Sequence, residues 1–154
     1  MLKKVEKEEV VENIENKIAT EEMANQAEAD FKKKLDEFSK HQFLLRLDEN
    51  GAGNLLQFLK EDAIWKFRQA YGIKDCVERI ESSLGDIDTN KGIYLNNVQL
   101  EAIGFFLQNV ETTGYEKAVR FVSIFDRITE VMQSVMSLHN ELEETRKIYY
   151  AYAN

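Results

Sequence analysis

The C-terminal part of the chain has the strongest hydrophobic pattern. Its apolar and aromatic residues recur at alternating spacings of three and four, which is the period of a helix that offers one seam to another helix. The seam consists of Phe121, Ile124, Ile128, Val131, Val135, Leu138, Leu142, Thr145, Tyr149 and Tyr152. Thr113 and Glu116 match a helix-capping box, so the pattern predicts a helix from about residue 113 to Tyr152.

A second long helical pattern begins close to the N-terminus. It predicts a helix from about Lys3 to Leu47, and a break near Thr20 is compatible with it because apolar residues become sparse there. The part before Thr20 carries only a narrow apolar stripe, which is typical of a helical arm. Because the seam of the last helix narrows beyond Leu138, we expect the two long helices to pair as an antiparallel hairpin.

Glycines divide the middle of the chain. There is no proline, and six of the seven glycines lie where the periodicity breaks, which is typical of helices joined by short loops. The predicted segments are a loop at residues 48–54, a helix from Asn54 to Gly72, a short helix from Asp75 to Gly85 and a helix that begins at Asn96. Only residues 92–95 alternate as a strand would, so no sheet is predicted.

Two of the middle helices carry large apolar side chains. Trp65 lies among Ile64 and Phe67 and is interpreted as a core residue. The helix after Asn96 is apolar nearly all round, which is typical of a central, buried helix. Gly104 would allow a neighbouring helix to approach it closely.

These patterns predict an all-α fold of about five helices. The long N- and C-terminal helices pair antiparallel, and three shorter helices pack at one end. The length of 154 residues favours a single helical domain over residues 1–154, with an N-terminal arm at 1–20 and a core at 21–154.

Composition and charge limit the classes of function. The formal net charge of −8 argues against nucleic acid or an anionic membrane as the main partner and favours a protein with a basic surface. Cys76 is the only cysteine, so no intramolecular disulfide can form. We find no secretory signal and no apolar run of membrane-spanning length, and we expect a cytoplasmic protein.

One segment has the composition of a metal loop. Residues 86–97 resemble the calcium loop of the EF-hand family over these twelve residues alone, with Asp86, Asp88 and Asn90 at the first, third and fifth positions. Lys91 stands where the family has glycine, and Asn97 where it has a bidentate glutamate. The same residue types are common in turns, and we interpret the segment as an interhelical turn.

The other motifs favour structural roles. Residues 70–81 have a weak likeness to a helix-turn-helix, but their acidic residues would repel phosphates. His41 and His139 are far apart and belong to no Glu-x-x-His pair. We therefore predict no catalytic residue, no metal and no cofactor, and Cys76 is expected to be a buried apolar residue.

The sequence is most consistent with a non-enzymatic helical protein–protein interaction module, acting as an adaptor, an assembly subunit or an inhibitor. Homo-oligomerisation through the terminal helices is compatible with this prediction. The alternative is a small ligand- or calcium-responsive regulator that uses residues 86–97. The interface candidates are the residues of the distal stripe, namely Ile14, Ile18, Leu142, Tyr149 and Tyr152.

Overall fold

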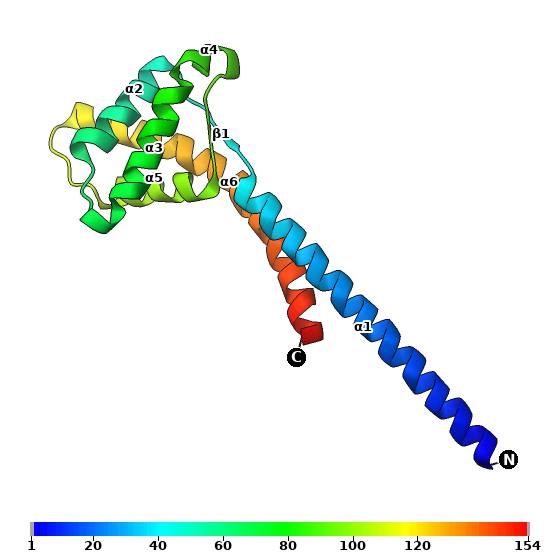
Figure 1. Ribbon diagram of the computed structural model, residues 1–154. Coiled ribbons are helices and arrows are strands. Elements are labelled where there is room, and N and C mark those ends of the chain that lie inside the picture. Colours follow the sequence, from blue (N-terminus) through cyan, green and yellow to red (C-terminus); the bar gives the residue numbers. More distant parts are fainter. Residues whose placement is uncertain (1, 154) are drawn as a thin grey trace. The chain divides into compact units, whose positions relative to one another are not determined.

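A computed structural model describes the backbone of residues 2–153 and the side chains of residues 20–153. The chain divides into two compact units, unit 1 with residues 1–38 and 138–154 and unit 2 with residues 39–137. In the described part of the chain, no helix is long and apolar enough to cross a membrane. The elements, shown in Figure 1, are α1 (Leu2–Lys40), β1 (Phe43–Leu45), α2 (Glu49–Gln57), the π-helical turn η1 (Phe58–Asp62), the 3-10 turn η2 (Phe67–Gln69), α3 (Ala70–Ser83), the 3-10 turn η3 (Leu84–Asp86), the one-turn α4 (Ile87–Asn90), β2 (Ile93–Leu95), α5 (Asn97–Asn109) and α6 (Tyr115–Ala153).

Unit 1 is a hairpin of α1 and the end of α6, which lie side by side in Figure 1. Lys34 Nζ lies 3.5 Å from Glu141 Oε2, and the ring of Phe31 stacks on Tyr149 further along. An earlier residue of α1 thus contacts a later residue of α6. The two helices run in opposite directions, and the predicted antiparallel pairing is confirmed. No break occurs at Thr20, because α1 is one continuous helix.

The first helix ends at Lys40, and the prediction that it reaches Leu47 is wrong. Phe43, Leu45 and Leu47 are buried, whereas Arg46 between them is exposed. This alternation is the period of a strand rather than of a helix. The chain accordingly leaves the helix and forms β1.

The two strands of unit 2 form a small antiparallel sheet. Phe43 pairs with Leu95 and Leu45 with Ile93. Gly92, just before β2, is buried, and a Cβ built there would overlap the carbonyl oxygen of Leu45 and lie 3.0 Å from the Cα of Arg46. Only glycine lets the two backbones approach this closely.

The starts of the middle helices differ from the prediction. Asp48 caps α2, since its Oδ1 accepts a hydrogen bond of 2.7 Å from the Gly51 N–H, so residues 48–54 are not a loop. Beyond η1 the chain is extended, and α3 then begins at Ala70 and runs through Gly72. Neither Asn54 nor Asp75 begins a helix.

The last two helices follow the prediction more closely. Asn96 and Gln99 form the predicted capping box of α5, with reciprocal hydrogen bonds of 2.9 and 2.8 Å. The final helix begins at Tyr115, directly after Gly114 at φ 89°, rather than with Thr113 as its cap. The positive φ of Gly114 turns the chain into α6.

The core of unit 2 lies between the short helices and the first part of α6. The predicted seam faces this core, because Ile124, Ile128, Val131 and Val135 are all buried. Phe58 of η1 meets Phe121 edge to face with ring centroids 5.1 Å apart. A Cβ at Gly104 would lie 3.7 Å from Ile128, in ordinary contact.

Candidate functional site

Of the interface residues predicted on the terminal helices, those whose side chains are described make contacts within unit 1. Leu142 is buried, and Tyr149 is half-buried with its ring stacked on Phe31 at 5.6 Å and an interplanar angle of 5°. Tyr152 is partly exposed, and its hydroxyl lies 3.7 Å from Met23 Sδ. Ile14 and Ile18 lie outside the residues whose side chains are described.

The segment with the composition of a calcium loop has a different backbone. Asp86 ends η3, whereas Asp88 and Asn90 lie on the helical turn of α4, and all three are exposed. Lys91, at φ 59°, makes the left-handed turn that leads toward β2. The described residues contain no group of three or more His, Cys, Asp or Glu that could hold a metal ion.

Calcium is therefore expected to leave the stability of the protein unchanged. The segment lacks the bidentate acid on which calcium loops depend, because Asn97 begins α5 instead. Thermal unfolding measured with millimolar calcium or with a chelator should give the same midpoint. A higher midpoint with calcium that disappears in Asp86→Ala with Asp88→Ala would support the alternative regulatory function.

The cysteine and the two histidines each contact different neighbours. Cys76 is buried, and its burial raises the pKa of the thiol to about 12. Its Sγ donates to the carbonyl oxygen of Gln99 at 3.8 Å, and the buried thiol stays protonated at neutral pH. His139 contacts Phe38 in unit 1, and His41 contacts Phe43 in unit 2.

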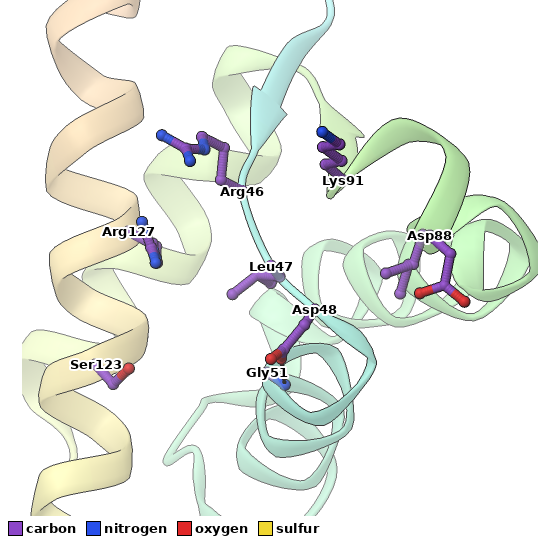
Figure 2. A pocket seen from close by; sticks show the side chains of 9 residues that line it. Arg46, Leu47, Asp48, Gly51, Asp88, Lys91, Ser123 and Arg127 are labelled. Atoms are coloured by element: carbon purple, nitrogen blue, oxygen red, sulfur yellow. Dashed lines mark hydrogen bonds between the residues drawn. The ribbon is translucent and has the colours of Figure 1, made fainter.

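A polar pocket of about 360 Å³ lies between α6 and the start of α2 (Figure 2). Two of its cations, Arg46 and Arg127, each have a guanidinium nitrogen 3.1 Å from a carboxylate oxygen of Glu130. The hydrogen bond from Arg127, and then that from Arg46, lower the pKa of the Glu130 carboxyl. Asp48 caps α2, so most charged groups of this pocket already have structural partners.

The largest departure from the prediction is the exposure of the segment before α3. Trp65, expected in the core, is 43% exposed, and Phe67 and Tyr71 are 86% and 81% exposed. Phe67 begins the 3-10 turn η2, Tyr71 lies in the first turn of α3, and both side chains project into water. Ile64, Trp65 and Phe67 give the same sequence signal as core residues, so the sequence did not reveal their exposure.

The fourth predicted helix, α5, is also not buried all round. Its inner side, including Leu100 and Ile103, is buried, whereas Val98 and Phe105 are exposed. Val98, Ala102 and Phe105 recur at spacings of four and three, so they form a second stripe along the outer side of the helix. The prediction of a central helix failed because an all-apolar pattern does not show which sides of a helix are covered by the rest of the chain.

A groove of about 520 Å³ separates α5 from the start of α3. One wall consists of Arg68, Gln69 and Gly72, and the other includes the exposed stripe of α5 with Glu101 beside it. Phe67 and Tyr71 do not line the groove, but they are the sequence neighbours of Arg68 and Gly72, which do. We call this surface the aromatic face and define it by Trp65, Phe67, Tyr71, Val98 and Phe105.

Comparison of the chain with models of protein families, with curated proteins and with solved structures gave no match.

Proposed function

We propose that this chain is a non-enzymatic protein–protein interaction module, acting as an adaptor, an assembly subunit or an inhibitor, and that it docks its partner on the aromatic face. The observation that carries the proposal is the near-complete exposure of Phe67 and Tyr71 beside an apolar groove. Keeping such side chains in water is unfavourable, and grouped exposed apolar residues normally mark a partner site.

The residue types on the aromatic face also support docking of a protein. Tryptophan and tyrosine are enriched among the residues that dominate binding energy at protein interfaces, and they lose little conformational entropy on contact. The groove between α3 and α5 would receive side chains of the partner. The terminal helices supply a second candidate surface, because Ile148, Tyr150 and Tyr152 remain exposed there.

Photo-crosslinking in cells of the source organism tests the proposal. We would place p-benzoylphenylalanine at Phe67, at Tyr71 and at Tyr152, with Tyr115 at the start of α6 as a control that is 84% exposed. We expect one discrete adduct from Phe67 and Tyr71 that the control does not give. Phe67→Ser with Tyr71→Ser should lower capture at least about tenfold, as expected when interface anchors are lost.

The free energy of unfolding of the double serine variant shows whether a loss of capture comes from lost docking or from lost folding. The double serine variant should keep its free energy of unfolding within about 0.5 kcal/mol, because both side chains are already in water. An adduct from Tyr152 alone would move the interface to the terminal helices. Equal adducts from Tyr115, or none from Phe67 and Tyr71, would contradict docking on the aromatic face.

A further inference from the structure

The segment that carries the exposed aromatic residues has a charge opposite to that of the whole chain. Between Ala63 and Lys74 there are three cations, Lys66, Arg68 and Lys74, and no acidic residue, although the chain has a net charge of −8. Interactions between exposed charges are largely screened beyond about 8 Å at physiological salt. A partner at the aromatic face would therefore meet the local positive charge rather than the net charge.

Of the two acidic residues that flank this segment in sequence, Asp62 forms an ion pair with Lys117. Asp75 accepts a hydrogen bond of 3.0 Å from the neutral side chain of Gln99 and keeps its negative charge. Lys74 lies 3.7 Å from Glu78, but within the described part of the chain Lys66 and Arg68 form no ion pair. Two cations are thus left beside exposed aromatic rings.

The residues that line the groove further limit the kinds of partner that can bind there. Its α5 wall is mainly apolar, with Val98, Ala102 and Phe105, and its α3 wall carries Arg68. A recess of this size can accept the apolar side chains of a helix, whereas a membrane surface or a nucleic-acid backbone would leave it unfilled. A partner that places apolar residues in the groove and acidic residues beside Lys66 and Arg68 would match both the apolar wall and the two cations.

We infer that the occupant of the aromatic face is an acidic amphipathic helix of another protein, which seats apolar residues in the groove and carboxylates against Lys66 and Arg68. This inference rests on the proposed function and names the chemistry of its partner. Glu101 on the α5 wall also gives the docked helix a direction. The carboxylates of the partner should lie at the Arg68 side, with neutral or basic residues beside Glu101.

Two synthetic helical peptides provide the test. Both would have about 18 residues, with leucine or phenylalanine at the same helical spacings, and the remaining surface positions would be glutamate in one peptide and lysine in the other. Binding to the full chain would be followed by anisotropy of a dye on the peptide. Emission from Trp65, the only tryptophan, would report whether contact occurs at this segment.

The acidic peptide should bind at least about tenfold more tightly than the basic one at low salt, and added salt should reduce the difference. Lys66→Glu with Arg68→Glu should reverse the preference between the peptides. The matched control is Lys91→Glu with Arg120→Glu, which changes the net charge equally at exposed sites outside the groove, and it should leave the preference unchanged.

Other outcomes overturn the inference. Equal binding of the two peptides, or binding of neither, would exclude an acidic helix as the occupant. A shift of Trp65 emission with vesicles of phosphatidylcholine and phosphatidylserine, or with a single-stranded oligonucleotide, but not with the acidic peptide would assign the face to another class of partner. If the peptides fail while the adduct at Phe67 persists, the proposed function stands and only the chemistry of the partner is wrong.

Discussion

Replacing Phe58 with alanine is expected to lower the free energy of unfolding by about 3–5 kcal/mol, the range for large aromatic residues truncated in a core. Phe58 is fully buried in η1, and its ring packs edge to face on Phe121 of α6. Removal of the ring would leave a cavity between two elements that cannot close without moving α6. Urea unfolding followed by circular dichroism measures the loss.

The same substitution at Phe67 is the matched control. Because the ring of Phe67 is almost wholly in water, Phe67→Ala should change the free energy of unfolding by less than about 0.5 kcal/mol. The contrast tests the burial of two phenylalanines in the same unit. Equal losses for both variants would contradict the exposure of the aromatic face and, with it, the proposed docking site.

Gly92→Ala is expected to destabilise the protein by about 3 kcal/mol, at the upper end of the usual cost of overpacking. The new methyl group would overlap the carbonyl oxygen of Leu45, so the two strands would have to separate. Backbone atoms cannot rotate away as a flexible side chain can. Urea unfolding measures the loss, and amide hydrogen exchange of Leu45 and Ile93 would show whether the sheet opens.

Gly53→Ala, also in unit 2, is expected to change the free energy of unfolding in the opposite direction. Gly53 is exposed within α2, and a Cβ there would meet nothing within 4 Å. Alanine should therefore stabilise the protein by about 0.5–1 kcal/mol, because glycine in a helix costs conformational entropy. If Gly92→Ala and Gly53→Ala changed the free energy of unfolding by similar amounts, β1 and β2 would have to lie far enough apart at Gly92 to accept a methyl group.

Local patterns predicted the long helices because their causes lie close together in sequence. The seam of α6 repeats over many turns, so residues such as Ile124, Ile128 and Val135 are buried as expected. The capping box of Asn96 and Gln99 is likewise complete within one turn. The start of α2 was not predicted correctly, since Asp48 rather than Asn54 caps this helix.

The features that were missed depend on residues distant in sequence. A strand of only three residues, such as β1, forms because β2 lies beside it. The candidate surface was missed for a related reason, since a large apolar residue gives the same signal whether it faces a core or a partner. Trp65 and Phe105 were placed in the core by composition, and their exposure could be found only once the packing of α3 and α5 was known.

The hairpin of unit 1 also sets an order for folding during synthesis. During synthesis α1 is made before unit 2, whereas the residues of α6 that pack on Phe31 and Phe38 are made after it. All of unit 2 is translated in between, so its sheet and core can form while α1 still has no partner. The dense alternation of lysine and glutamate along α1 would keep this segment soluble in the interval.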